Sequence, residues 1–260
     1  MHSLRSPHHA VENTDSPPQA TDVQSAEENR LLRALPASEY AQLMMHLEPI
    51  ELTAGQTLWQ AEAKIHSVYF PRTCVLSLLK PLDDEPPVEA ATVGREGMVG
   101  TSIALGVHAT GVRAIAQISG TGARMDAERL VEWIRTPNNA LFPLLLRAAQ
   151  ALQEQTAQSV ACNRRHGIDE RCARWLLMTQ DRVGTDQFAL TQEFLAFMLG
   201  VRRASVTVAA GILQQAGLIR YHRGSITVVN RAGLEAASCE CYRNIFRKYE
   251  LLLGEQPTIG

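Results

Sequence analysis

The sequence lacks the features that several large classes of protein require. It has no run of about 18 apolar residues, so it contains no candidate transmembrane helix, and its first residues form no apolar signal-peptide segment. Cysteine is scarce, and the five that occur are scattered along the chain, which is typical of reduced thiols rather than of a disulfide framework. A Walker loop, a nucleophile–base constellation and a catalytic carboxylate pair are also missing. We therefore expect a cytoplasmic protein without membrane association that is not an enzyme.

Charge is unevenly distributed, although the total is close to neutral. The chain has 25 basic residues (Lys and Arg) and 27 acidic residues. Residues 161–250 carry 13 basic and 8 acidic residues, a net charge of +5, whereas residues 1–160 carry 12 basic and 18 acidic residues, a net charge of −6. This asymmetry indicates that only the C-terminal third contacts a polyanion. A solvated charged face is the alternative.

The length of 260 residues favours two modest domains. Residues 1–24 are rich in Pro, Ser, Thr and Gln and have no apolar period, so we predict a disordered tail there. Ser25 and Glu28 form a capping box ahead of a short helix that Pro36 ends, and a second short helix is predicted over residues 38–46.

Short β-rich segments follow between residues 49 and 125. Their spacing is typical of a β-sandwich or barrel, and the clearest segments cover residues 65–71, 75–79, 89–93 and 112–117. Asp126 then caps a helix that runs to about residue 135.

A long helix is predicted over residues 139–164. Spacings that alternate between four and three residues form a heptad seam, made up of Leu141, Leu145, Ala148, Leu152, Gln155, Ser159 and Cys162. We interpret this seam as the interface of a homodimer, because Leu144 and Ala149 can serve the intramolecular face. Packing of the seam against the chain's own sheet is the alternative.

The most informative stretch is residues 190–219, which follow a helix predicted over residues 168–183. Thr191 caps a short helix, Gly200 permits a tight turn, and a second helix runs from about residue 202 to residue 216. Two short helices joined by a turn that contains Gly are typical of a helix-turn-helix, in which the second helix enters the DNA major groove.

The second helix of this motif has an apolar face and a polar face. Val206, Ala210 and Leu213 are expected to face the core, which leaves Arg203, Ser205, Thr207 and Gln214 on the outside. Residues 218–229 predict a β-hairpin that turns near Arg223 and Gly224, as in the wing of a winged helix. The excess of arginine in this region argues against a plain helical hairpin.

From these residues, the chain resembles the bacterial Crp/Fnr family of regulators, typified by the cyclic-AMP receptor and the fumarate–nitrate regulator. The likeness covers about residues 28–235 and is most specific in the helix-turn-helix, at Thr191, Gly200, Arg203, Val206, Leu213, Gly217, Leu218 and Ile219. It implies an α+β fold in four parts. These are a β-roll (jelly roll) of cyclic-nucleotide-binding type at residues 25–136, a dimerisation helix at 137–166, a winged helix-turn-helix at 167–250 and a tail at 251–260.

The resemblance also implies roles for individual residues. Arg203 would read a base, since a guanidinium can donate two hydrogen bonds to guanine O6 and N7. Residues expected to contact DNA around it are Thr191, Gln192, Arg202, Ser205, Thr207 and Arg223. The family often has Glu and Arg where this chain has Ala204 and Val208, so we expect an operator sequence that differs from the common one.

The expected effector pocket departs from the family pattern. Where the family holds the ribose with a carboxylate and the cyclic phosphate with an arginine, this chain has Thr101 and Thr110. Arg113 lies near the phosphate position but three residues after Thr110, and Met98 lies in the same stretch. Without a cation aimed at the phosphate, binding of a cyclic monophosphate is not expected. We therefore interpret the β-roll as a scaffold whose ligand is lost or is different.

We expect neither a metal site nor a cofactor. Cys239 and Cys241 are separated by one residue, which is too close for the usual zinc-ligand pair, and no second pair follows. The histidines outside the tail are scattered: His46, His66, His108, His166 and His222.

The sequence therefore predicts a homodimeric, sequence-specific DNA-binding transcription regulator that acts on a two-fold symmetric operator. Its expected partners are double-stranded DNA, a second copy of the chain and RNA polymerase. One alternative is a receptor for a small molecule other than cyclic AMP that gates DNA binding. A second is an interaction protein that has lost DNA binding.

Overall fold

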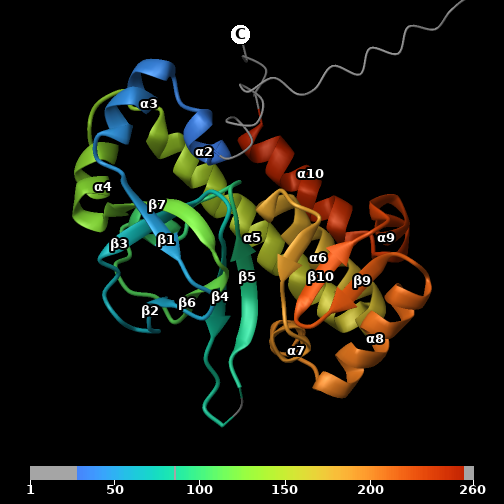
Figure 1. Ribbon diagram of the computed structural model, residues 1–260. Helices are drawn as coiled ribbons and strands as arrows, with labels where there is room; N and C mark the ends of the chain where they lie inside the picture. The colour runs from blue at the N-terminus through green and yellow to red at the C-terminus, as the bar shows by residue number, and fades with distance from the viewer. Residues whose placement is uncertain (1–27, 85, 255–260) are drawn as a thin grey trace, which may run out of the picture.

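A computed structural model describes residues 28–84 and 86–254 of the chain (Figure 1). The tail predicted over residues 1–24 and the cap predicted at Ser25 lie outside these residues. The first described helix, α2 (Arg30–Arg33), is capped by Asn29, whose Oδ1 accepts a hydrogen bond from the Leu32 amide at 3.1 Å. Asn29 Nδ2 also donates to the carbonyls of Pro71 and Gly97, at 2.8 and 2.9 Å, so this buried amide fixes the start of α2 to the β-roll.

The β-roll consists of two antiparallel sheets. One has the strand order β1-β7-β3 and the other β2-β6-β4-β5. The strands are β1 (Glu48–Leu52), β2 (Thr57–Trp59), β3 (Ser67–Pro71), β4 (Val75–Lys80), β5 (Val88–Val93), β6 (Arg113–Ile118) and β7 (Gly120–Asp126). The four segments predicted from the sequence correspond to β3, β4, β5 and β6, and the α+β fold class is confirmed.

The sequence analysis missed β7, because glycine is normally depleted in strands. Gly120 and Gly122 are required here by close approach of the neighbouring chain. A Cβ atom at Gly120 would lie 2.6 Å from the Cys74 amide nitrogen, and one at Gly122 would lie 2.9 Å from the Phe70 carbonyl oxygen.

Four helical segments surround the roll. They are α3 (Ala37–Met44), the 3₁₀ turn η1 (Thr101–Ile103), α4 (Ala127–Ile134) and the long helix α5 (Leu141–Arg165). Asp126 caps α4 as predicted, by accepting hydrogen bonds from the amides of Glu128 and Arg129. The start of α5 is capped from a distance, because the Glu39 carboxylate of α3 accepts hydrogen bonds from the amides of Ala140 and Leu141.

The C-terminal part begins with α6 (Ile168–Val183), whose bounds agree with the predicted helix. It continues with β8 (Gln187–Ala189), α7 (Gln192–Leu199), α8 (Arg203–Gln215), β9 (Ile219–His222), β10 (Ser225–Val228), α9 (Arg231–Ala237) and α10 (Cys241–Leu253). In Figure 1, α10 runs back beside α5. Because α10 continues to Leu253, residues 251–253 of the segment that was predicted as a tail are helical.

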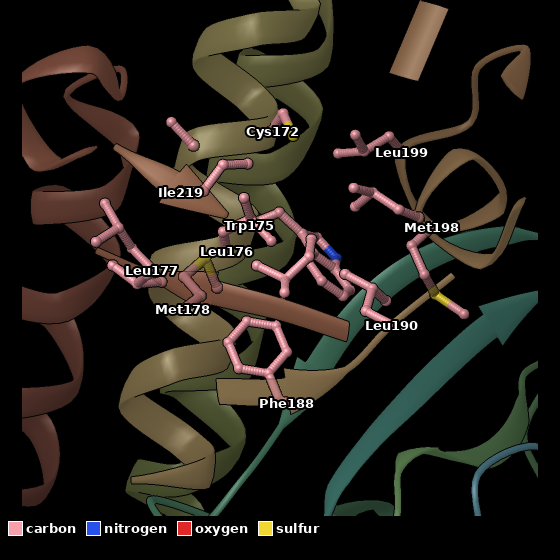
Figure 2. Close-up of a cluster of buried hydrophobic side chains, with 14 of the residues drawn as sticks. Cys172, Trp175, Leu176, Leu177, Met178, Phe188, Leu190, Met198, Leu199 and Ile219 are labelled. Atoms are coloured by element: carbon pink, nitrogen blue, oxygen red, sulfur yellow. The ribbon is translucent and has the colours of Figure 1, made fainter. Parts of the chain in front are cut away.

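The two parts share a continuous apolar core. Residues of α6 pack with Phe188, Leu190, Met198 and Leu199, as Figure 2 shows for Trp175, Leu176 and Met178. The same cluster includes four side chains of β4 and β6: Val75, Leu79, Ile115 and Ile118. The β-roll therefore packs directly on the C-terminal part and is not connected to it only through α5.

A buried ion pair crosses this contact. Arg182 of α6 donates from Nε to Glu96 Oε1 at 2.8 Å, and from Nη2 to Gln155 Oε1 of α5 at 3.0 Å and the Thr92 carbonyl of β5 at 3.2 Å. The side chains of Arg182 and Glu96 are 6% and 11% exposed. A Cβ at Gly94 would overlap the aliphatic stem of Arg182, so glycine at this position makes room for the guanidinium.

The predicted dimer seam on α5 is wrong for most of its residues. Leu141, Leu145 and Ala148 are at most 4% exposed and lie in the core of their own β-roll. Gln155 is 2% exposed because it binds Thr92 and Arg182. Leu152 is partly buried against the same core, and Ser159 is half-buried. The alternative, packing against the chain's own β-roll, describes Leu141, Leu145, Ala148 and Gln155 correctly.

None of the single helices in the described ranges is long and apolar enough to cross a bilayer. Taken together, α7 and α8 have the length and apolar composition of a membrane span, but the two helices are bent by 106° relative to each other.

The first prediction concerns Glu89, which lies on β5 at the contact with α6. Its carboxylate accepts hydrogen bonds from Ser77 Oγ at 2.9 Å and Trp175 Nε1 at 3.1 Å, but burial dominates and raises the pKa of Glu89 from 4.5 to about 7. Between these two pKa values the unfolded chain has released its proton while the folded protein still holds it. The free energy of unfolding therefore falls as the pH rises, by up to about 3 kcal/mol in all, and becomes constant above about pH 7. Glu89→Gln removes this loss.

Urea unfolding of Glu89→Gln and of the unmodified protein at about pH 5 and pH 8 measures the effect. We expect the variant to gain stability relative to the unmodified protein as the pH rises. Glu51→Gln, at an exposed position on β1, serves as the control. Parallel stability profiles for Glu89→Gln and the unmodified protein would contradict this prediction.

Candidate nucleic-acid interface

Helices α7 and α8 form a helix-turn-helix. They meet at 106°, within the range of about 90–120° that this motif has. Thr191 caps α7 as predicted, since its Oγ1 accepts a hydrogen bond from the Phe194 amide at 3.1 Å. Gly200 ends α7 with φ +62°, and this left-handed conformation is the reason that the turn needs glycine.

The apolar face of α8 packs inward as predicted. Val206, Ala210 and Leu213 are at most 3% exposed, and Ala209 joins them. Leu195, Met198 and Leu199 of α7 lie in the same core. This packing fixes which face of α8 points to solvent.

The outward face of α8 begins with two arginines. Arg202 precedes the first turn, Arg203 opens the helix, and both side chains are exposed. Thr207 is exposed one turn later and donates a hydrogen bond to Gln192 Oε1 of α7 at 2.9 Å, so these two predicted contact residues also join the two helices. Ser205 is half-buried at the edge of this face.

Two apolar side chains stand on the same helix without cover in the protomer. Val208 is 63% exposed and Ile212 is 49% exposed. The sequence analysis noted Val208 only as a departure from the family pattern, and it missed Ile212. Both side chains therefore present methyl groups to solvent on the outward face of α8.

The predicted wing is present. β9 and β10 are joined by Arg223 and Gly224, with φ +46° and +79°, as in a two-residue turn of type I′. The turn carries the exposed Arg223 at its tip. β8 adds a third strand on the other side of β10.

Tyr221 fixes the wing against the helices. Its amide donates to Gln214 Oε1 of α8 at 2.8 Å, and its hydroxyl donates to the Leu190 carbonyl at 3.0 Å. Gln214 is exposed, as expected, and this contact also holds it to the wing. Tyr221 therefore links the wing to the last turns of α8 and to the segment before α7.

The surface of α8 and the wing is cationic. Arg202, Arg203, Arg220 and Arg223 are exposed, and none of them forms a salt bridge with another residue of the described chain. Glu193 is the only acidic residue between positions 191 and 229. Four unpaired guanidinium groups around one helix and one hairpin suit the binding of a polyanion.

The predicted effector residues occupy several parts of the β-roll. Met98 is 1% exposed in the apolar core, and Thr101 opens η1 and is 8% exposed. Thr110 precedes β6, and Arg113 is its first residue. Thr110 Oγ1 and Arg113 Nε are both buried, and neither has a hydrogen-bond partner among the residues that the structure describes.

The structure also brings together four metal-ligating side chains that the sequence analysis did not connect. Ligand atoms of Cys162, His166, Cys239 and Cys241 lie within 4.8 Å of one another. The spacing of four residues between Cys162 and His166 on a helix is the signal that was overlooked, because their partners lie more than 70 positions further along the chain.

Comparison with known proteins identifies the C-terminal domain. Residues 170–237, from α6 to α9, match the sequence model of the Crp-like helix-turn-helix domain. A search of curated proteins finds no significant match to the sequence.

This chain matches several solved structures of the same fold over nearly the whole length of those structures. FixK2 from Bradyrhizobium japonicum has 15% sequence identity and a TM-score of 0.61, over 74% of this chain and 98% of that one. TTHB099 from Thermus thermophilus, a CRP-family transcriptional regulator, has 17% identity and a TM-score of 0.59, over 73% and 96%. CLP from Xanthomonas campestris, described as a c-di-GMP responsive global regulator, has 15% identity and a TM-score of 0.58, over 74% and 99%.

These comparisons confirm the predicted resemblance to Crp/Fnr regulators. The likeness in sequence lies in the helix-turn-helix domain, and the likeness in fold extends over the β-roll, the long helix and the winged helix.

Proposed function

We propose that the protein is a homodimeric transcription regulator that binds a two-fold symmetric DNA site through α8 and the β9–β10 wing. The observation that carries this proposal is the position of Arg203. It lies at the exposed start of a helix whose other face is buried in a Crp-like helix-turn-helix, and it has no ion-pair partner among the described residues.

Arg203 suits direct readout of a base. The N-terminal residues of a recognition helix contact base edges in the major groove, and arginine pairs with guanine through two hydrogen bonds. Val208 and Ile212 follow on this helix and would contact thymine methyl groups. A half-site with one guanine beside thymines fits this set of side chains.

The surrounding polar residues suit the phosphate backbone. Thr191 and Gln192 stand at the start of α7, where amide groups and the helix dipole favour an anion. Arg202 and Ser205 flank the start of α8, and Arg223 at the tip of the wing reaches beyond the helices. These contacts would set the register on DNA without reading its sequence.

The second prediction separates these two roles with a pair of arginine variants. Arg203→Ala should lose about 1–3 kcal/mol of binding free energy on the specific site and much less on scrambled DNA. Arg223→Gly should weaken binding to both DNAs alike and reduce the salt slope by about 1. Because Arg223 has φ +46°, where glycine is less strained, this variant should fold at least as stably as the unmodified protein.

Fluorescence anisotropy at several salt concentrations measures both effects. Equal losses for Arg203→Ala on specific and scrambled DNA would show that Arg203 contacts phosphate only. Unchanged binding in both variants would contradict the proposed interface.

We place the dimer contact on the outward face of α5. Leu146, Ala149, Gln153, Ala157 and Val160 follow one another at spacings of three and four, which is the repeat of a helix–helix seam. Leu146 is 39% exposed and Val160 is 67% exposed in the protomer. Burial of these side chains against a second copy would hold two recognition helices at a fixed separation.

The third prediction is that Leu146→Glu combined with Val160→Glu gives a folded monomer. In the dimer, the two substituted positions of each copy would bring four carboxylates into a buried interface, which is unfavourable. In the protomer, positions 146 and 160 are exposed to solvent, so the single chain should still fold. Operator affinity should fall by about 10²–10⁴-fold, since two linked half-sites no longer bind together. Met45→Glu, at an apolar position that is 76% exposed on the β-roll, is the control. Light scattering that still reports a dimer for the double variant would refute this contact.

We propose further that the β-roll does not bind cyclic AMP or cyclic GMP. A charge-assisted hydrogen bond is about twice as strong as a neutral one, and the threonines at positions 101 and 110 supply no charge. Loss of both recognition groups should weaken affinity by about two to four orders of magnitude.

The fourth prediction is that calorimetry detects no binding heat with cyclic AMP at micromolar protein. Arg113 is the one cation of the predicted pocket, so Arg113→Ala is the informative variant. A micromolar dissociation constant that disappears in Arg113→Ala would contradict the prediction and would make Arg113 the phosphate ligand.

A ligand-gated receptor is the second candidate function. The observation that favours it is the set of buried polar atoms in the β-roll that have no partner in the described ranges: Ser102 Oγ, Thr110 Oγ1, Arg113 Nε and Gln117 Nε2. Buried polar groups normally have hydrogen-bond partners, and a polar ligand would supply them. Gel shifts with and without candidate ligands, including cyclic di-GMP, distinguish gated from constitutive DNA binding.

A further inference from the structure

Three cysteines and one histidine converge where the end of α5 meets the start of α10. Cys162 lies in the last turn of α5, and His166 directly follows that helix. Cys239 and Cys241 flank Glu240, which precedes α10. The two pairs come from segments that are distant in the chain, and the three cysteines form an apolar cluster of their own.

The distances between the ligand atoms match those of a metal site. Cys162 Sγ lies 3.5 Å from Cys239 Sγ, and Cys241 Sγ lies 3.5 Å from His166 Nδ1. In a tetrahedral site with Zn–S of about 2.3 Å and Zn–N of about 2.0–2.1 Å, two sulfurs lie about 3.8 Å apart, and a sulfur and a nitrogen lie about 3.6 Å apart. All the ligand atoms are within 4.8 Å of one another, so small side-chain adjustments complete the tetrahedron.

The residues around the cluster orient these ligands. His166 Nε2 lies 3.2 Å from Glu240 Oε2, while its Nδ1 faces the cysteines. This carboxylate–histidine arrangement is the one that fixes the imidazole of metal-bound histidines. Gln158 Nε2 donates to Cys241 Sγ at 3.0 Å, as a donor to a thiolate would.

The local charge also suits a thiolate-rich centre. Three thiolates, a neutral imidazole and a divalent ion sum to one negative charge. Arg171 and Arg174 interact electrostatically with Cys162 and Cys239, and both arginines are at most 9% exposed. The Nε atom of each is buried without a hydrogen-bond partner in the described chain.

We propose that Cys162, His166, Cys239 and Cys241 bind one zinc ion. The soft sulfur ligands exclude magnesium and calcium, which prefer oxygen. Because four protein ligands fill a tetrahedral shell, the site is structural and has no open position for a substrate. It fastens α10 to the end of α5, next to the junction at Gly167 where the chain turns into α6.

A disulfide between Cys162 and Cys239 is the competing chemistry at these atoms. It would use two of the four ligands and would leave the orientation of His166 and Cys241 without a role. The zinc site accounts for all four side chains, and it does not depend on the proposed DNA binding.

Metal analysis of the untagged full-length protein, purified without chelator, tests the proposal. We expect about one zinc per chain. His166→Gln and Cys241→Ser should each reduce the retained zinc at least tenfold after dialysis against a weak chelator, whereas Cys172→Ala, which removes a buried thiol of α6 outside the cluster, should retain it.

Cobalt substitution tests the unmodified protein and therefore does not depend on whether the variants fold. We expect the ligand-field bands of a tetrahedral site together with a thiolate-to-cobalt charge-transfer band. Cys241→His keeps four ligands and should shift these bands while it retains the metal. Absence of bound zinc and of the tetrahedral cobalt spectrum would overturn the proposal. Zinc retention in His166→Gln and Cys241→Ser that equals the retention of the unmodified protein would also overturn it. So would a Cys162–Cys239 disulfide found by mass spectrometry of the native protein.

Discussion

The buried guanidinium of Arg182 is the interaction on which the arrangement of the two parts depends. It contacts the β-roll at Glu96 and Thr92, α5 at Gln155 and its own helix α6 at the Met178 carbonyl. Burial alone would lower the pKa of Arg182, but Glu96, Tyr249 and Asp181 together raise it above its ordinary value, so the group is charged. Loss of one partner from such a pair typically costs about 3–5 kcal/mol. Since α6 leads directly into the helix-turn-helix, this ion pair fixes where α8 lies relative to the β-roll.

The division of α5 into faces follows from the same constraint. One face supplies Leu141, Leu145 and Ala148 to the core of the β-roll and Gln155 to Arg182. A second face receives α10, through contacts such as that between Lys248 and Glu154 at 3.6 Å. The third face carries the exposed Leu146 and Val160, and it is the face that the proposed dimer contact uses. The cysteine–histidine cluster lies at the end of the second face, where a bound ion would hold α10 in place.

The sequence predicted the C-terminal domain better than the β-roll, for physical reasons. Thr191, Gly200 and the Arg223–Gly224 turn act locally, through a cap, a left-handed turn residue and a hairpin, so each can be recognised from neighbouring residues. β7 is held by long-range pairing and contains glycines that a strand pattern does not favour. The dimer seam was misassigned because a heptad pattern shows that a helix face is buried but not which surface covers it. The convergence of Cys162 and Cys239 depends on the packing of α10 against α5, which the local pattern does not contain.

The central claim is that two copies of α8 read one symmetric DNA site. DNase footprinting of the full-length protein on genomic fragments selected for binding tests this claim most directly. The account predicts two protected half-sites related by a two-fold axis, with centres about 10–10.5 base pairs or one helical turn apart. Protection spread evenly along the fragments, or a single unpaired half-site that saturates the protein, would contradict it.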